Sequence, residues 1–235
     1  MRYRTRVNTG CRLDPGFVFL YVPQMGDDLP AALAFGTVIL AAGKSLRMQR
    51  PKLLLPWGQT TVLGRLISTW QLLAARQVAV VLDGSQLHVL QELDRLNFDL
   101  SNRIPNPRPE SGMWSSIRCA ATWQGWAPGL SHVVIALGDQ PQIQLETLRE
   151  LLKFGAANPA KICQPSFAGR LRHPILLPTS AFARIQSDPA RDMKDFLAAR
   201  AAECAGFDVA DPGLALDLDT PEDYEALQAR YFSDE

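Results

Sequence analysis

Hydrophobic and polar positions follow two different rhythms along the chain from about residue 37 to the C-terminus. Short, almost continuous apolar runs, such as residues 133–137, alternate with longer stretches in which apolar residues recur every three or four positions. The first pattern is typical of strands buried on both faces, and the second is typical of amphipathic helices. Their alternation predicts an α/β fold in which helices cover both faces of a mostly parallel sheet.

Seven strands and seven helices follow from this pattern. The expected strands span residues 37–41, 78–82, 101–105, 132–137, 161–165, 173–177 and 215–218. The expected helices span residues 61–75, 87–96, 115–124, 145–154, 180–186, 193–204 and 222–231. Between two of the strands, Phe167-Ala168-Gly169-Arg170 predicts a small β-hairpin region.

Residues 1–34 show no such periodicity and are rich in Arg, Pro, Gly and Asp. We expect them to form an N-terminal extension that is partly disordered. Residues 35–235 contain neither a fixed-period repeat nor a linker, and we expect them to form one domain. With 235 residues in total, the chain is long enough for one α/β domain with a full core.

Composition and charge restrict the classes of partner. Hydrophobic residues make up 47% of the chain and charged residues 20%, which is typical of a globular protein. Lys and Arg together number 24, as do Asp and Glu, so no overall positive field favours nucleic acid or an anionic membrane as partner. Local groups would have to bind any anion.

Cysteine spacing and hydropathy indicate a cytoplasmic protein. The chain has four widely separated cysteines: Cys11, Cys119, Cys163 and Cys204. Without a C-x-x-C pair, neither a zinc site nor a disulfide framework is expected. No stretch approaches 18 apolar residues, so a membrane span is not expected. The apolar run at 17–22 is too short for a signal-peptide core and ends at Pro23.

Gly43-Lys44-Ser45 matches the last three residues of a P-loop, G-x-x-x-x-G-K-[ST]. The motif also requires a glycine at position 38, which is Val38, and the nearest upstream glycine, Gly36, lies two residues too early. The spacing therefore excludes a P-loop. The chain also lacks G-x-G-x-x-G and any Ser/His/Asp arrangement, so neither a dinucleotide redox cofactor nor covalent catalysis is indicated.

Ala41-Ala42-Gly43 follows the first expected strand and forms a turn of small residues. Small side chains let backbone N–H groups approach an anion closely, and the start of a following helix would add partial positive charge. Arg47 and Lys52 then place two cations close behind the turn. This combination suits a triphosphate, although an ordinary strand-to-helix turn with solvated basic residues would show the same pattern.

Asp139 comes directly after the apolar run that ends at Leu137 and Gly138. Ligands of open α/β sheets bind beyond the carboxyl ends of strands, where a carboxylate is able to hold Mg²⁺ beside phosphate oxygens. The alternative is that Asp139 is a turn residue or caps the helix expected from Leu145.

Asp217 and Asp219 flank Leu218, an alternation that places both acids on one face of a short strand. Thr220-Pro221 then has the form of a helix start, with a capping residue followed by proline at the first helical position. Capping explains Thr220 and accounts for Asp219, but it does not explain two acids on one face. We therefore interpret the pair as a metal or substrate site.

Residues 106–116 follow the third expected strand and contain Gly112, which permits close approach of the backbone to a ligand. Ser115 and Ser116 open the next helix; one would serve as its cap, leaving the other to bind a nucleobase. His173 is one of only three histidines, and a lone histidine is more often structural than catalytic.

Five segments together resemble the MobA-like nucleotidyltransferases. The family's opening motif, roughly L-A-A-G-x-S-x-R-M-G-x-x-K, corresponds to residues 40–52. The Asn-Pro…Gly…Ser, Gly-Asp-x-Pro, Gly-His-Pro and Asp-x-Asp-Thr-Pro-Glu-Asp motifs correspond in order to residues 106–116, 138–141, 172–174 and 217–223. Gln49 and Arg172 replace glycines of the family pattern.

The resemblance implies a three-layer, Rossmann-like fold of the nucleotide-diphospho-sugar transferase type and an Mg²⁺-dependent enzyme. The reaction implied is transfer of CMP from CTP to the phosphate of a molybdopterin-type cofactor, with release of pyrophosphate. The residues that match the family's nucleotide-binding positions are Leu40, Ala41, Ala42, Gly43, Arg47, Lys52, Gly112 and Ser116. Of the remaining roles, catalysis falls to Arg47, Lys52 and Asp139, Mg²⁺ binding to Asp139 and Asp219, and acceptor binding to His173 and Asp217.

Several alternatives remain open at this stage. Ala42 stands where family members that use GTP carry glycine, which favours the smaller base of CTP, but GTP is the alternative nucleotide. The acceptor could be another phosphorylated small molecule. A nucleotide-sensing or cofactor-delivery protein without turnover is the non-enzyme alternative. A molybdenum hydroxylase apo-enzyme or its maturation chaperone would be the protein partner, and neither nucleic acid nor membrane is expected.

Overall fold

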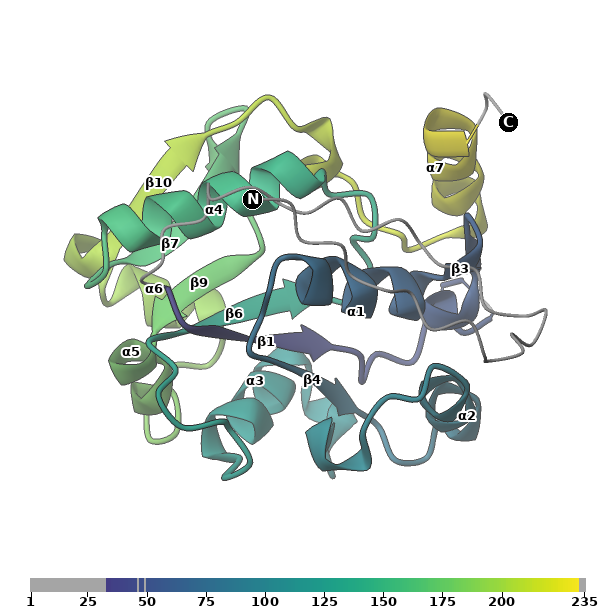
Figure 1. Ribbon diagram of the computed structural model, residues 1–235, viewed down its shortest axis with the longest axis horizontal. Helices are drawn as coiled ribbons and strands as arrows, with labels where there is room; N and C mark the ends of the chain where they lie inside the picture. The colour runs from purple at the N-terminus through teal and green to yellow at the C-terminus, as the bar shows by residue number, and fades with distance from the viewer. Residues whose placement is uncertain (1–32, 46, 49, 233–235) are drawn as a thin grey trace, which may run out of the picture.

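The structure, a computed structural model, describes residues 33–45, 47–48 and 50–232. An eight-stranded sheet lies at its centre (Figure 1). Across the sheet the strand order is β10-β7-β9-β6-β1-β4-β5, and β8 pairs with β7. The strands are β1 (Phe35–Leu40), β4 (Gln77–Leu82), β5 (Arg103–Pro105), β6 (His132–Leu137), β7 (Ile162–Phe167), β8 (Arg170–Leu171), β9 (Ile175–Pro178) and β10 (Cys204–Asp208).

Most strand pairs are parallel, as the apolar runs predict. β1 lies between β4 and β6 and is parallel to both, and the pairs β4–β5 and β7–β10 are also parallel. β9 runs antiparallel to its neighbours β6 and β7, so the sheet is mixed. The central position of β1 explains why nearly all of its residues are buried.

Helices cover both faces of the sheet and create two apolar cores. The helices are α1 (Val62–Leu72), α2 (Leu87–Arg95), α3 (Met113–Thr122), α4 (Leu145–Ala157), α5 (Thr179–Arg184), α6 (Met193–Ala198) and α7 (Pro221–Phe232). Consecutive residues of β1 face opposite ways: Ile39 joins the core beneath α1, α2, α4 and α7, whereas Val38 joins the core with α3, α5 and α6. The predicted three-layer α/β fold is therefore confirmed.

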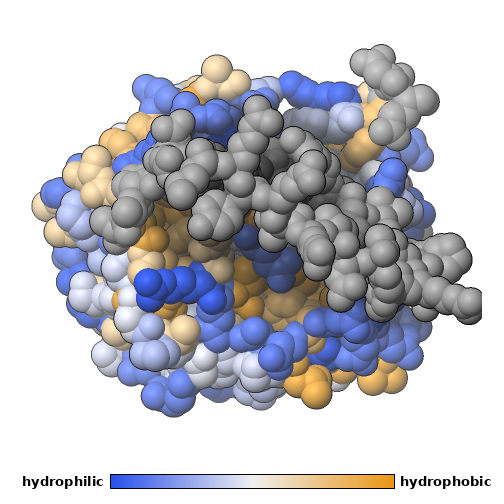
Figure 2. Space-filling view, viewed as in Figure 1, coloured by the Kyte–Doolittle hydropathy of each residue, from blue (hydrophilic) through white to orange (hydrophobic). Residues whose placement is uncertain are grey.

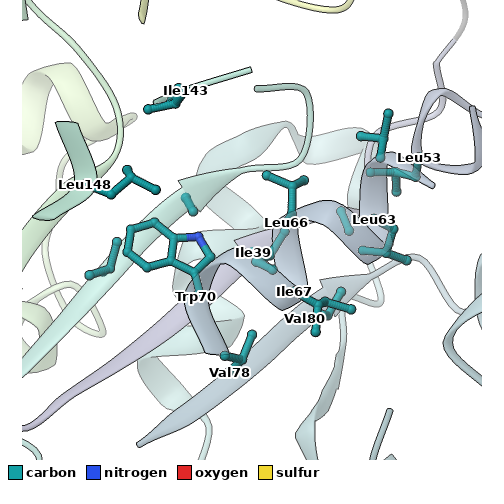
Figure 3. Close-up of a cluster of buried hydrophobic side chains, with 14 of the residues drawn as sticks. Ile39, Leu53, Leu63, Leu66, Ile67, Trp70, Val78, Val80, Ile143 and Leu148 are labelled. Atoms are coloured by element: carbon teal, nitrogen blue, oxygen red, sulfur yellow. The ribbon is translucent and has the colours of Figure 1, made fainter. Parts of the chain in front are cut away.

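Trp70 of α1 is a central residue of the first core and is only 2% exposed. Its indole extends from α1 toward Leu148 of α4, with Ile39 and Leu66 nearby (Figure 3). The ring of Phe35 packs edge-on at a centroid distance of 6.4 Å. One side chain therefore joins β1, α1 and α4.

The prediction of a late strand at residues 215–218 is wrong. A 3-10 helix occupies Pro212–Ala215, and no strand follows it before α7. Leu214 and Leu218 are buried because the segment lies on the first core, which produces the same apolar alternation as a strand. The last strand is instead β10, which the sequence assigned in part to the helix at 193–204; that helix ends at Ala198 and is followed by a 3-10 turn over Ala201–Glu203.

Two hairpins are present. The expected hairpin at 167–170 is confirmed: β7 turns through Ala168 and Gly169 into β8. A second hairpin, formed by β2 (Pro56–Trp57) and β3 (Thr60–Thr61), was not expected. Trp57 of this hairpin contacts the rings of Tyr231 and Phe232, so α7 covers it.

Polar residues predominate along the lower edge of the face in Figure 2, interrupted by small apolar areas.

The expected extension, residues 1–34, lies outside the described residues apart from its last two. Within the described part of the chain, every helix is too short or too polar to cross a membrane. Cytoplasmic localisation stays a prediction.

We expect Trp70→Ala to lower the free energy of unfolding by about 3–5 kcal/mol, because a large buried ring is replaced by a cavity. Leu72→Ala, in the same helix at a position that is 39% exposed, is the matched control and should cost less than about 1 kcal/mol. Urea denaturation followed by circular dichroism measures both values. Equal losses for the two variants would contradict the described core.

Candidate active site

A cavity of about 370 Å³ lies where the carboxyl ends of β1 and β6 meet. Eleven of the twelve residues singled out in the sequence line it: Leu40, Ala41, Ala42, Gly43, Arg47, Lys52, Gly112, Ser116, Asp139, Asp217 and Asp219. His173 does not. Four of the five motifs therefore converge on one place, although they span more than 170 residues of sequence.

The turn after β1 forms one wall of this cavity. Ala41 continues the ladder by donating its N–H to the carbonyl of Val81 at 2.8 Å. A side-chain carbon added at Gly43 would meet nothing within 4 Å, so the space beside the turn is open. The expected helix start is wrong, because no α-helix begins in the described residues between Gly43 and Val62. The available positive groups are thus backbone N–H groups and basic side chains.

Four charged side chains form an ion cluster at the opening of the cavity. The ammonium of Lys52 lies 2.7 Å from Asp139 Oδ2 and 3.3 Å from Asp219 Oδ1. Arg47 Nη2 lies 2.7 Å from the other carboxylate oxygen of Asp219. The side chains of Lys52, Asp139 and Asp219 are 15%, 22% and 26% exposed, so these charges are partly shielded from water.

Asp139 is positioned by the backbone around Gly138. A side-chain carbon at Gly138 would come within 2.6 Å of the carbonyl oxygen of Leu40, so only glycine allows this approach of β6 to β1. The carbonyl of Asp139 accepts the N–H of Leu218 at 3.1 Å, which attaches the acidic loop to the end of β6. Asp139 Oδ1 is buried and has no hydrogen-bond partner among the described residues.

The loop that carries Asp217 and Asp219 is held by side-chain hydrogen bonds. Asp211, which is 1% exposed, accepts the N–H groups of Gly213 and Gln144 and the hydroxyl of Thr147. The amide of Gln142 donates to the carbonyl of Gly213 at 3.0 Å and also to that of Leu216. The two acids share a cavity although they do not lie on a strand.

Asp217 differs from its neighbours in environment. Burial raises the pKa of its carboxyl group, and the hydrogen bond from Gln140 Nε2 at 2.9 Å partly offsets this effect. The charges of Asp139 and Asp219 raise the pKa further. Together these effects favour the protonated form of the Asp217 carboxyl group.

The opposite wall is the start of α3. Gly112 has a φ of +83°, a conformation that glycine adopts without strain, and it forms the N-cap of the helix. Neither serine caps α3, contrary to expectation: Ser115 donates to the carbonyl of Gly112. The amide of buried Asn106 donates to both serine hydroxyls, at 2.8 Å to Ser115 and 3.0 Å to Ser116.

A second cavity, of about 760 Å³, adjoins the first, and Met113 lines both. Its walls are mostly apolar and include Ile175, Met193 and Leu197. His173 lies here, with a buried Nε2 atom that has no partner among the described residues. Burial lowers the pKa of His173 from 6.5 to about 4, against the opposing charge of Asp139, so the ring is neutral near pH 7.

The acidic residues satisfy part of what Mg²⁺ requires. No group of three or more metal-binding side chains occurs among the described residues. Asp139 and Asp219 nevertheless present two carboxylates at one point, and Asp139 Oδ1 is an unused buried acceptor. Mg²⁺ commonly binds to one or two carboxylates and completes its shell with substrate phosphates and water. The pair fits such a shared site.

Sequence reasoning missed several residues of the two cavities. Leu53, Pro109 and Met113 line the first, while Gln164 and Lys194 line the second. Pro109 and Met113 lie within the 106–116 motif at positions that carry no polar group, and Leu53 directly follows the opening motif. The second cavity is assembled mainly from β7 to β10, where the only motif is the one around His173.

An α/β sheet with a cavity beyond β1 and β6, edged by cations and acids, is the arrangement that a nucleotidyltransferase needs. The model of the MobA-like NTP transferase domain matches residues 37–204, and the chain belongs to this family. The residue pair Asp217 and Asp219 lies beyond the matched region.

Full-length relatives give further detail. The chain is 27% identical over 200 residues to the molybdenum cofactor cytidylyltransferase of Escherichia coli (strain K12), covering 84% of this chain and 97% of the relative. It is also 27% identical to the nicotine blue oxidoreductase of Paenarthrobacter nicotinovorans, with the same coverage. The crystal structure of Rv0371c from Mycobacterium tuberculosis H37Rv superposes with a TM-score of 0.62 at 27% identity, covering 84% of this chain and 98% of that one.

We expect the stability of the protein to fall as the pH drops from about 6.5 toward 4, because the folded state keeps His173 neutral while the unfolded state takes up a proton. By pH 5 this difference amounts to about 2 kcal/mol relative to pH 8. His173→Gln should remove that part of the pH dependence, whereas His88→Gln, at an exposed histidine, should retain it. Urea denaturation at several pH values provides the measurement; parallel curves for wild type and His173→Gln would contradict the assignment.

Proposed function

We propose that this enzyme transfers CMP from CTP to the terminal phosphate of a molybdopterin-type cofactor and releases pyrophosphate. The observation that carries the proposal is the meeting of Lys52 with Asp139 and Asp219 beside the open turn at Gly43. Cations that bind phosphates and carboxylates that bind a metal thus lie within one cavity. The similarity to a molybdenum cofactor cytidylyltransferase supports the same reaction.

The chemistry is an in-line displacement at phosphorus. A phosphate oxygen of the acceptor forms a bond to the α-phosphorus, while the bond from that phosphorus to the bridging oxygen of the β-phosphate breaks and pyrophosphate leaves. Both substrates are anions, so the enzyme has to orient them and neutralise their charge; no enzyme nucleophile is needed. Arg47 and the backbone at 41–43 would hold the β- and γ-phosphates, and Lys52 would stabilise charge on the α-phosphate.

Asp139 and Asp219 would hold Mg²⁺ against the triphosphate. When bound, the metal would withdraw negative charge from the phosphate oxygens and favour departure of pyrophosphate. Crystals of Rv0371c have been solved in complex with manganese, which supports divalent-metal binding at this fold. Gly112 and Ser116, on the opposite wall, would contact the base and ribose.

The second cavity suits the acceptor. Its apolar walls would bury a flat heterocyclic ring, and the neutral His173 would accept a hydrogen bond from a ring N–H through Nε2. Asp217 lines the first cavity, where it would contact the acceptor phosphate. Met113 lines both cavities, so an acceptor in the second would reach the nucleotide past this side chain. A molybdenum hydroxylase apo-enzyme or its chaperone would receive the product.

Two alternatives predict different products. A GTP-dependent enzyme, or one acting on another phosphorylated small molecule, would release pyrophosphate only with its own pair of substrates. A delivery or sensing protein would bind nucleotide and produce none. Nicotine blue oxidoreductase shows that full-length relatives carry names from a different reaction class, but no dinucleotide-binding glycine motif is present in this chain.

Pyrophosphate release measured with each of the four NTPs, with and without molybdopterin cofactor, distinguishes these functions. We expect release with CTP only when the cofactor and Mg²⁺ are both present. Release with GTP but not with CTP would show that GTP is the nucleotide substrate. Release with a sugar phosphate in place of the cofactor would show that the acceptor is a different molecule. Nucleotide binding without any release would overturn the enzymatic proposal.

Asp139→Asn should reduce the rate of pyrophosphate release at least about 100-fold, since a charge-stabilising contact of about 3 kcal/mol is lost. The amide preserves the shape of the side chain, so the circular dichroism spectrum should not change. Glu150→Gln, on an exposed face of α4, removes the same charge away from the cavity and should leave the rate unaltered. A wild-type rate for Asp139→Asn in Mg²⁺ would exclude Asp139 from the mechanism.

Ala42→Gly tests the choice of base. The variant removes one methyl group from the wall of the nucleotide cavity and should raise kcat/KM for GTP relative to CTP by about tenfold. The ratio for UTP over CTP serves as an internal control, because both are pyrimidines and need no added space. An unchanged GTP to CTP ratio would mean that Ala42 does not limit the size of the base.

A further inference from the structure

Lys52 occupies the position between the two carboxylates that would hold the metal. Its ammonium contacts Asp139 Oδ2 and Asp219 Oδ1, while Arg47 contacts the second oxygen of Asp219. Three of the four carboxylate oxygens are therefore engaged by cations, and only Asp139 Oδ1 has no partner among the described residues. Within this cluster, two positive side chains balance two negative ones.

This balance affects each ligand separately. A divalent ion binds carboxylate oxygen at about 2.1 Å, so it would lie next to the ammonium of Lys52 and be repelled by it. A triphosphate arriving without metal would approach Asp139 and Asp219, whose negative charge would become uncompensated once Lys52 turned toward the phosphates. Either ligand alone thus breaks an ion pair without replacing it.

When both ligands bind together, neither the repulsion between Lys52 and the metal nor the uncompensated charge of the carboxylates remains. Asp139 and Asp219 would bind the metal once Lys52 leaves them, and Lys52 would then neutralise phosphate charge that the metal leaves uncompensated. We propose that Lys52 is an internal counterion that exchanges the carboxylates of Asp139 and Asp219 for the triphosphate, so that metal and nucleotide bind cooperatively. This inference rests on the proposed nucleotide site and is independent of which acceptor is used.

Lys52 is better suited to this exchange than Arg47. The Lys52 side chain is 15% exposed, whereas that of Arg47 is 71% exposed, and water screens an exposed ion pair to a small net value. Lys52 also contacts both carboxylates, whereas Arg47 contacts one. A single ammonium on a flexible stem is able to turn from one set of oxygens to another without matching a fixed planar geometry.

Mn²⁺ serves as the probe, because loss of the free-ion paramagnetic resonance signal reports binding without turnover. We expect wild-type protein to bind Mn²⁺ weakly in the absence of nucleotide. Lys52→Met should bind Mn²⁺ roughly tenfold or more tightly under the same conditions, because the competing cation is gone. Lys153→Met, at an exposed lysine of α4 that lines none of the described cavities, should behave as wild type.

Calorimetric titration of CTP, with Mn²⁺ in excess or with EDTA, measures the coupling. Mn²⁺ should tighten CTP binding strongly in wild type and roughly tenfold less in Lys52→Met, because linkage is reciprocal. Equal Mn²⁺ affinity of nucleotide-free wild type and folded Lys52→Met would overturn the proposal. If the variant fails to fold, the wild-type titrations still decide, since CTP binding that is indifferent to metal would also overturn it. Failure of CTP to bind in any condition would instead refute the nucleotide site, while the Mn²⁺ comparison would still test Lys52.

Discussion

The ion pair between Lys52 and Asp139 joins two parts of the chain that are 87 residues apart, and the rest of the site depends on it. It forms only because β1 and β6 are neighbours in register, with Leu40 opposite Leu137, so that the segments after both strands leave the sheet at one point. Pairing of the strands in the sheet therefore brings charged residues that are distant in sequence close together. The two apolar cores on its faces keep that register in place.

From this contact outward, the site divides by chemical character. The turn at Gly43 and the N-terminus of α3 at Gly112 are open and lack side chains that would obstruct a nucleotide. Toward β9 and α6 the surface becomes apolar, and its one titratable ring, His173, is held neutral by burial. A charged region and a low-polarity region thus adjoin at Met113, as the proposed transfer of a nucleotide to a ring-bearing acceptor requires.

Much of the fold was accessible from hydrophobic pattern alone, because central strands such as β1 and β6 are buried on both faces and consist almost entirely of apolar residues. The pattern was misleading where burial has another cause. Leu214 and Leu218 are buried because their loop packs on the first core, and their spacing imitates a strand. β10 was missed because Ala205 and Gly206 have little strand preference, and pairing with β7 rather than local propensity holds it there. The motifs located the residues around the first cavity. They did not predict which side-chain atoms form ion pairs, because that depends on the folded structure. The second cavity has almost no motif.

The acidic loop shows that the sheet and the acids proposed to act in the site lie in different parts of the sequence. Its placement rests on the hydrogen bonds of Asp211 to the start of α4, on those of Gln142 to the loop carbonyls, and on one backbone contact to Asp139. It contributes no strand to the sheet and lies beyond residues 37–204, which the family model matches. Mutations are therefore able to change the length or the charge of this segment while the three-layer fold persists. Proteins descended from one ancestral fold would then differ in chemistry without differing in architecture.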